Sequence, residues 1–238
     1  MKLGFNVVAW QASAPGLSTK DEWLSWAAGA ANIRHDAPLA PCINLPMMTA
    51  RRLNSGSRLA VDCGLGLLNA HQVDAVVFTS RHGELERNFK ILQALARAES
   101  LSPTEFTMSV HNSAVGSLTI AAKAPLVSSS ISAGSDSFQQ GLFEVRALFA
   151  SGLKQVLLVD FDGVIPDFYR PYIPPDNVFP YAVALLLCNG NTIWCESQKT
   201  PQRVASVLPQ SLQFLHGWLA SCSSFQVQGE RNHWHWSR

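Results

Sequence analysis

Apolar residues along this chain follow two patterns, one typical of strands and one typical of helices, and segments with the two patterns alternate. Short apolar or alternating runs predict strands over residues 3–10, 74–80, 125–131, 154–161, 179–188 and 192–196. Apolar residues at helical spacing predict helices after a cap at Ser18 or Thr19, and over 48–68 (interrupted at 55–57), 84–96, 105–121, 135–150 and about 200–220. The predicted helix over 84–96 has one apolar side, formed by Leu85, Phe89, Leu92 and Leu95 or Ala96.

The order of these elements predicts the fold class. Repeated strand–helix–strand units are typical of an α/β fold with a mostly parallel sheet and helices on both faces. Asn189-Gly190-Asn191 predicts a hairpin between the last two strands, which adds antiparallel strands at the sheet edge. We expect one domain over 1–238, with a core of about 1–196 and a C-terminal helix and Trp/His tail over 200–238.

Composition narrows the class of protein. The chain is 47% hydrophobic and 15% charged, which is typical of a globular protein with few charges and favours a permanent protein partner. A net charge of +1 predicts no nucleic-acid binding, and no apolar stretch approaches the roughly 20 residues of a membrane span. The five cysteines include no CxxC pair and the N-terminus has no signal-peptide pattern, so we expect a reduced, cytoplasmic protein.

A buried strand ends in an acidic motif, Asp160-Phe161-Asp162-Gly163-Val164. This motif resembles the nucleophile motif of haloacid-dehalogenase-type phosphatases, in which the first Asp attacks phosphorus and Mg²⁺ binds both carboxylates. That chemistry also needs an acidic pair downstream, and no two acidic residues are adjacent after Asp167. We favour a turn in which the Asp side chains bind loop amides, and keep a Mg²⁺-dependent phosphatase as the alternative function.

Three other motifs invite chemical interpretations. His233 and His235 alternate with tryptophans at a metal-compatible spacing, but an amphipathic terminal strand explains them without a third ligand. His111 lies among small apolar residues, which favours a hydrogen-bonded core histidine over a general base. Cys63-Gly64-Leu65-Gly66 lacks the preceding strand and the last glycine of a dinucleotide loop. We therefore expect neither a metal nor a cofactor.

The block from Glu105 to Asp167 carries the most information. It contains a small-residue helix around Ser113 to Ser117, a strand over 126–131, the turn Ser132-Ala133-Gly134-Ser135-Asp136-Ser137 opening a helix, and a strand over 156–160. This order resembles the thiolase-like half of β-ketoacyl synthases. The resemblance implies that the nucleophilic cysteine of that family falls at Ser135, and this chain has no cysteine between Cys63 and Cys188.

Together with the Glu22-Trp23-Leu24-Ser25-Trp26 helix and the Trp/His tail, these residues resemble short ketosynthase-like subunits of aryl polyene and related fatty-acid or polyketide pathways. The resemblance implies a non-catalytic, chain-length-factor-like subunit that pairs with a full-length β-ketoacyl synthase and meets acyl carrier protein through that complex. It implies an interface strand at Val127, Ser129 and Ile131. It also implies a tunnel end formed by Phe106, Met108, Val110 and His111. A scaffold without a tunnel role remains a further alternative.

Overall fold

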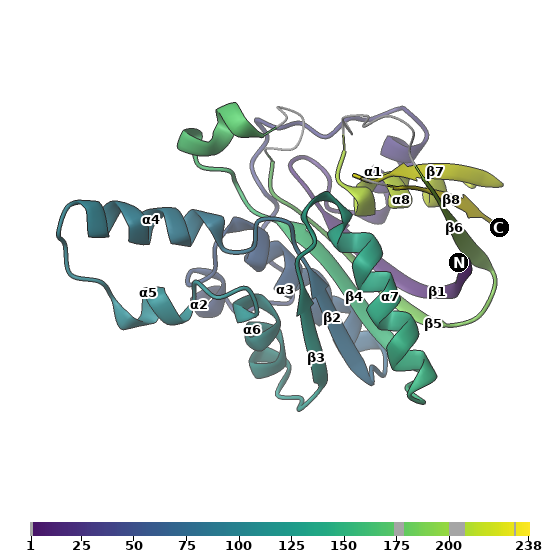
Figure 1. Ribbon diagram of the computed structural model, residues 1–238, viewed down its shortest axis with the longest axis horizontal. Helices are drawn as coiled ribbons and strands as arrows, with labels where there is room; N and C mark the ends of the chain where they lie inside the picture. Colours follow the sequence, from purple (N-terminus) through teal and green to yellow (C-terminus); the bar gives the residue numbers. More distant parts are fainter. Residues whose placement is uncertain (1, 174–178, 200–207, 231) are drawn as a thin grey trace.

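The computed structural model describes residues 2–173, 179–199, 208–230 and 232–238. Among these residues one eight-stranded sheet has the order β3-β2-β4-β5-β1-β6-β8-β7 (Figure 1). The strands are β1 (Lys2–Ser13), β2 (Ala75–Thr79), β3 (Val127–Ile131), β4 (Gln155–Asp162), β5 (Tyr181–Asn189), β6 (Ile193–Lys199), β7 (Ser224–Gln228) and β8 (Asn232–Ser237). The strands of this sheet therefore come from the whole length of the described chain, and the two edge strands are β3 and β7.

The helices are α1 (Lys20–Ala27), α2 (Met47–Ala50), α3 (Ser55–Ala70), α4 (Leu85–Ala96), α5 (Pro103–Thr107), α6 (Ser113–Ala122), α7 (Ser137–Ala150) and α8 (Gln210–Leu219), with 3₁₀ turns η1 (Gly134–Asp136) and η2 (Asp167–Tyr172). Because side chains alternate along a strand, β4 divides its apolar residues between two cores. Val156 and Leu158 join the core under α7, whereas Leu157 and Val159 join the core under α3 and α6. Helices thus cover both faces of the sheet (Figure 1).

The expected excess of parallel strands is wrong. Among the described strands, only β2 makes parallel pairs, with β3 and with β4. The pairs β4–β5, β5–β1, β1–β6, β6–β8 and β8–β7 are antiparallel. The strand–helix–strand units identified from the sequence lie in one half of the sheet. In the other half β1 and β6 pair with strands distant in the sequence, whereas β7 and β8 are consecutive strands that pair with each other.

The predicted hairpin at 189–191 is also wrong, because β1 lies between β5 and β6. Phe5 pairs with Asn189 on one side and with Ile193 on the other, so the connection crosses β1 instead of turning beside it. A Cβ atom at Gly4 would collide with the side chain of Asn191 and the carbonyl oxygen of Gly190. The absent side chain at Gly4 is what lets the chain cross there.

Three predicted helices have different limits. The helix expected over 105–121 is two helices, α5 and α6, separated by residues 108–112. The helix expected over 48–68 is divided at 51–54, before the predicted interruption, so α3 begins at Ser55. The last helix is α8 over Gln210–Leu219, and residues 200–207 of its predicted range lie outside the described residues.

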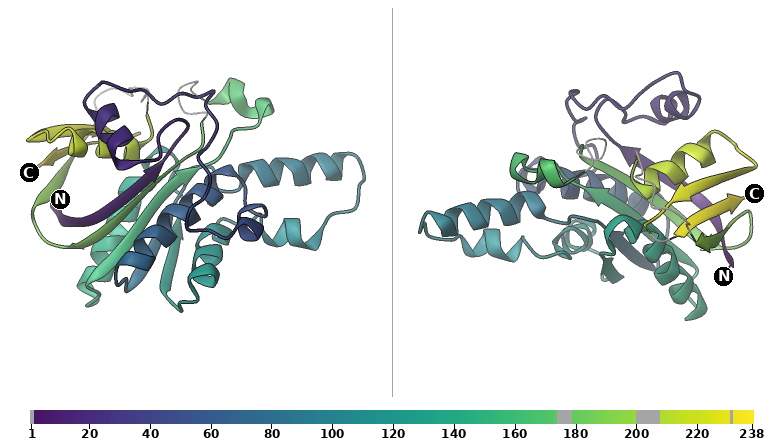
Figure 2. Two further views of the ribbon diagram at one scale, coloured as in Figure 1. Left: turned by 180° about the vertical axis from the view of Figure 1, so that it is seen from behind. Right: turned by 45° about the horizontal axis from the view of Figure 1, so that its top comes forward.

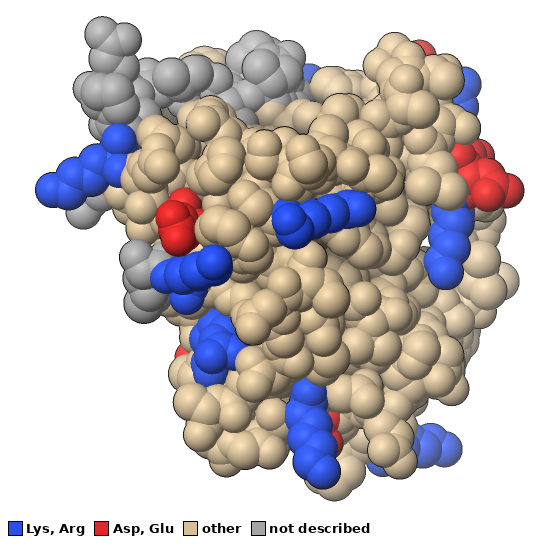
Figure 3. Space-filling model, turned by 90° about the vertical axis from the view of Figure 1, so that its right-hand side faces the viewer, with Lys and Arg blue, Asp and Glu red and all other residues tan. Residues whose placement is uncertain are grey.

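Two extensions lie at opposite ends of the molecule. The arm, residues 85–107, contains α4 and α5 and projects away from the sheet (Figures 1 and 2). The C-terminal unit, residues 210–237, contains α8, β7 and β8 and continues the sheet beyond β6. The surface at that end has widely spaced charges, mostly Lys and Arg, with uncharged areas between them (Figure 3). No helix in the described part is long and apolar enough to cross a membrane.

Candidate functional site: an open strand edge beside a helical arm

β3 forms one end of the described sheet. It pairs with β2 in parallel, and no described strand lies on its other side. Val127, Ser129 and Ile131 alternate with Ser128 and Ser130, so the three proposed interface residues share one face of the strand. Val127 is 55% exposed, and Ser129 Oγ donates a hydrogen bond of 2.9 Å to Glu144 Oε1 of α7. An edge with open backbone donors and acceptors is able to pair with a strand from another chain.

The four proposed tunnel residues lie in one segment, at the end of α5 and before α6, but they do not form one wall. Phe106 and Val110 are exposed. Met108 packs against the core beneath α3 and α6. His111 is half-buried, with Nε2 3.3 Å from the carbonyl oxygen of Ser80 and its ring against Gly83. His111 is thus hydrogen-bonded as expected, but the expected core position is wrong, because it is half-buried in the turn before α6.

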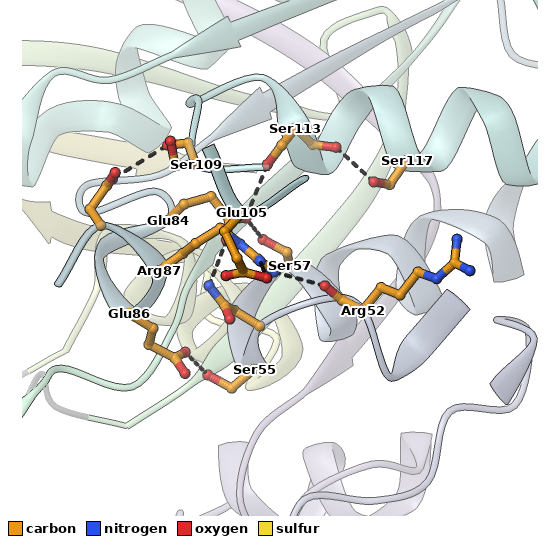
Figure 4. A network of polar contacts seen from close by, with 12 residues as sticks. Arg52, Ser55, Ser57, Glu84, Glu86, Arg87, Glu105, Ser109, Ser113 and Ser117 are labelled. Atoms are coloured by element: carbon orange, nitrogen blue, oxygen red, sulfur yellow. Dashed lines mark hydrogen bonds and ion pairs between the residues drawn. The ribbon is translucent and has the colours of Figure 1, made fainter. Parts of the chain in front are cut away.

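A buried ion network joins this segment to the body of the protein (Figure 4). Arg87 of α4 is buried, and its Nη1 lies 2.6 Å from Glu105 Oε1 of α5. Its Nη2 donates a 2.7 Å hydrogen bond to the carbonyl oxygen of Arg52, and its Nε lies 3.8 Å from Glu84 Oε2. Nothing in the sequence pattern indicated this network, because a Glu and an Arg three residues apart at a helix start are ordinarily solvent-exposed.

Glu84 and Glu86 bind the beginning of α3. Glu84 is 4% exposed and accepts hydrogen bonds from Asn54 Nδ2 at 2.8 Å, from Ser113 Oγ at 3.2 Å and from Ser57 Oγ. Glu86 accepts one from Ser55 Oγ. Two carboxylates at a helix N-terminus complement the positive end of the helix dipole. The base of the arm is therefore attached through the start of α3.

The turn at Ser135, where the resemblance places the nucleophile position of the family, is occupied by structural contacts. Ser135 is half-buried in η1, between β3 and α7. The adjacent Asp136 carboxylate accepts hydrogen bonds from Gln210 Nε2 at 2.9 Å and from the backbone N–H of Glu230 at 3.0 Å. Gly229 lies against the same carboxylate. The C-terminal unit thus docks on the turn at the position where the family resemblance implies a nucleophile.

Asp160 and Asp162 are buried and hydrogen-bonded within the chain. Asp160 accepts from Thr79 Oγ1 at 2.5 Å, from Ser211 Oγ at 2.6 Å and from Tyr181 OH at 2.9 Å. Asp162 Oδ1 accepts from Ser80 Oγ at 2.6 Å and from the backbone N–H of His82 at 2.8 Å. Burial raises the pKa of each carboxyl to about 6.

These contacts give the acidic pair a structural role. Asp160 joins β4 to β2, β5 and α8, since its donors come from those elements, and Asp162 binds the segment just after β2. No group of three metal-ligating side chains occurs among the described residues. The phosphatase alternative finds no support here.

The histidines of the C-terminal strand alternate with buried tryptophans, as the pattern predicted. Trp234 and Trp236 are buried in β8, while His233 and His235 are half-buried on its other face. His233 Nε2 lies 3.1 Å from Gln198 Oε1 of the paired strand β6. The five cysteines are free thiols.

Comparison with known families identifies the class of protein. Residues 23–237 match the family described as β-ketoacyl synthase, N-terminal domain. This match spans most of the chain, so the protein belongs to that family, and the resemblance stated from residues 105–167 is confirmed. No curated protein matches the chain.

Solved structures give a more specific likeness. The chain is 59% identical, over 99% of its length and 100% of the matched chain, to a chain in the structure described as ketosynthase (ApeO) in complex with its chain length factor (ApeC) from Xenorhabdus doucetiae, with a TM-score of 0.95. The ishigamide ketosynthase/chain length factor matches with a TM-score of 0.67 and 16% identity, over 83% of this chain and 67% of the other.

A β-ketoacyl synthase from Burkholderia phymatum matches with a TM-score of 0.61 and 13% identity, over 94% of this chain and 71% of the other. At these low identities the last two structures show the fold alone. Together the comparisons confirm the thiolase-like ketosynthase fold.

Proposed function

We propose that this protein is a non-catalytic, chain-length-factor-like subunit that pairs with a full-length β-ketoacyl synthase in an aryl polyene type of fatty-acid or polyketide biosynthesis. The observation that carries the proposal is the 59% identity, over the full matched chain, to a chain of a ketosynthase and chain length factor complex. In this proposal acyl carrier protein delivers its chain to the heterodimer, or to a dimer of heterodimers.

Two features favour the chain length factor over the condensing enzyme. The chain has no cysteine between Cys63 and Cys188, so the turn at Ser135 offers no thiolate. Asp136 beside it is engaged by the C-terminal unit through Gln210, and its charge opposes a further negative charge on Ser135.

The free cysteines agree with a reducing, cytoplasmic setting. We treat residues 1–238 as one domain, because β8 of the C-terminal unit pairs with β6.

The role of the partner is tested by activity. The purified chain, given acyl-thioester and malonyl carrier protein, should form no condensation product and no covalent adduct at Ser135, as read by mass spectrometry. Adding a full-length β-ketoacyl synthase as partner should give elongation. Turnover by this chain alone, or acylation of Ser135, would refute the non-catalytic role.

The proposed interface is β3, with Val127, Ser129 and Ile131 on the face toward α7. Stable obligate interfaces bury on the order of 2,000–5,000 Å² and carry few charges at their centre. A lysine in place of Val127 or Ile131 should therefore prevent co-purification with the ketosynthase. Lys20→Glu in α1 provides the control for a charge change on another element. Retained co-elution of both strand variants would exclude β3 as the interface.

The proposed tunnel end contains Phe106, Met108, Val110 and His111. Each buried CH₂ of a growing chain gains about 0.8 kcal/mol, whereas overpacking against a wall costs typically 1–3 kcal/mol, so one side chain is enough to stop elongation. Single Ala replacements should lengthen the products at one or two positions, and Val110→Trp should shorten them, with the heterodimer yield unchanged. If the product length is the same for all of these variants, the subunit acts as a scaffold without a tunnel role.

A further inference from the structure

The five-residue helix α5 has no buried side chain. Its capping bond from the Glu105 N–H to Ser102 Oγ and the bond from Thr107 Oγ1 to the carbonyl oxygen of Pro103 lie within the same segment. A helix of this length has no stability of its own in water. Its position must therefore come from its contacts with the rest of the protein.

Two side-chain contacts join this segment to α4. Arg87 Nη1 lies 2.6 Å from Glu105 Oε1, and Asn88 Nδ2 donates a longer hydrogen bond of 3.4 Å to the carbonyl oxygen of Ser109. The side chain of Arg87 is 5% exposed, whereas that of Glu105 is 46% exposed (Figure 4). The arginine is thus the fixed member of the pair, and Glu105 is the group whose position follows from it.

Arg87 is fixed because its guanidinium meets partners in separate directions. Besides Glu105, Nη2 binds the carbonyl oxygen of Arg52 just before α3, and Nε faces Glu84. Glu84 is itself held by the side chains of Asn54, Ser57 and Ser113. The planar guanidinium presents donors in a rigid fork, which the single ammonium of a lysine does not reproduce.

We infer that Arg87 is the positioning residue for residues 103–112. Acting through Glu105, it sets where Phe106 lies and supports Met108, which also packs against the core. The consequence for product length rests on the proposed function, since these two residues are candidates for the tunnel end. A close pair between a fixed guanidinium and a carboxylate is among the stronger polar contacts in proteins, so one pair is able to decide the location of α5, which has no buried side chain.

The experiment compares E105Q, R87K and a matched control, E99Q, in the complex with the ketosynthase. Glu99 pairs with Arg97 on the same arm, but both side chains are exposed and 3.9 Å apart. Hydrogen exchange of amides 103–112 and the product-length distribution are measured for each variant. Because Glu105 is half exposed, E105Q should leave the heterodimer yield and the amount of product unchanged.

E105Q removes the charge of the pair and R87K its guanidinium geometry, so each should raise amide exchange in 103–112 by about tenfold, the effect of replacing a charge-assisted contact by a weaker one, and broaden the range of product lengths. E99Q should change neither quantity. If E105Q and R87K match the wild type while F106A alters product length, the inference about Arg87 is wrong and the proposed function stands. If exchange rises but no variant, F106A and M108A included, alters length, Arg87 positions the segment and the tunnel role is refuted.

Discussion

The arm and the C-terminal unit lie at opposite ends of the molecule and are attached in different ways (Figure 2). The C-terminal unit is held on the body by aromatic packing: Phe5 and Trp236 have ring centroids 6.4 Å apart, and Phe143 and Trp234 5.5 Å apart. The arm is held at its base by a buried arginine and its carboxylates, with one aromatic contact of Phe89 on η2. Leu92 and Leu95 of the arm are more than half exposed.

The difference shows what each region does for the molecule. The C-terminal unit adds its apolar side chains to the core under α7, so it completes the fold. The arm leaves apolar side chains on its surface and uses charge where it meets the body. A buried ion pair adds little net stability, because desolvation offsets the attraction between the charges, but it fixes geometry. The charged contacts at the base of the arm therefore serve mainly to fix the position of the arm relative to the sheet.

The largest expected effect comes from removing an aromatic anchor of the C-terminal unit. Trp236 is 1% exposed and contacts the rings of Phe5, Phe214 and Phe225. Trp236→Ala should lower the free energy of unfolding by about 3–5 kcal/mol, through lost burial and the cavity left behind. Urea denaturation measures this loss. A change below 1 kcal/mol would show that the unit does not belong to the cooperative core.

Removing the charge at the base of the arm should cost somewhat less. Arg87→Met leaves the buried Glu84 without its cation, and such a loss costs about 3 kcal/mol. Arg97→Met on the exposed pair with Glu99 is the control and should change stability by less than about 0.5 kcal/mol. Equal unfolding curves for the two variants in urea would mean that the arm unfolds independently of the body.

The pH dependence of stability tests the acidic pair that attaches α8. Burial raises the pKa of Asp160 and of Asp162 to about 6, above the unfolded value of about 4. Between these values the folded state keeps protons that the unfolded state releases. The contribution of the pair is therefore greatest below pH about 4 and falls as pH rises to about 6, by on the order of 3 kcal/mol for each carboxyl.

Asp160→Asn isolates this contribution, since it removes one of the two titrations. The variant should lose part of the decrease between pH 4 and 6, measured as the difference from wild type in urea denaturation across that range. An unchanged pH profile would show that Asp160 stays ionised in the folded protein.

The smallest expected effect concerns the exposed side of the arm. Leu92→Gln and Leu95→Gln remove apolar groups that are already in water, so each should change the stability of the isolated chain by less than about 0.5 kcal/mol. Thermal unfolding of the free chain measures this. Leu142→Gln in α7, a fully buried position, is the contrasting variant and should destabilise strongly.

The sequence alone determined the local elements and the family. The inward face of α7, with Phe138, Leu142, Val145 and Phe149, followed from helical spacing, and so did the buried strand β4. These features depend on residues a few positions apart, so the spacing of apolar residues in the sequence is enough to predict them. The resemblance to the thiolase-like fold over 105–167 was visible for the same reason, since it rests on an order of helices and strands that are each local patterns.

The tertiary structure decided which elements are neighbours. β1 lies between β5 and β6 because Gly4 lets a connection from far along the chain cross it, and no local period records such a crossing. Leu92 and Leu95 share a helical face with Phe89 at the expected spacing, yet η2 packs on Phe89 and leaves the two leucines more than half exposed. Arg87 is buried because α3, α5 and the start of α4 surround it. Burial depends on what distant segments place around a residue, and for that reason the sequence pattern did not show it.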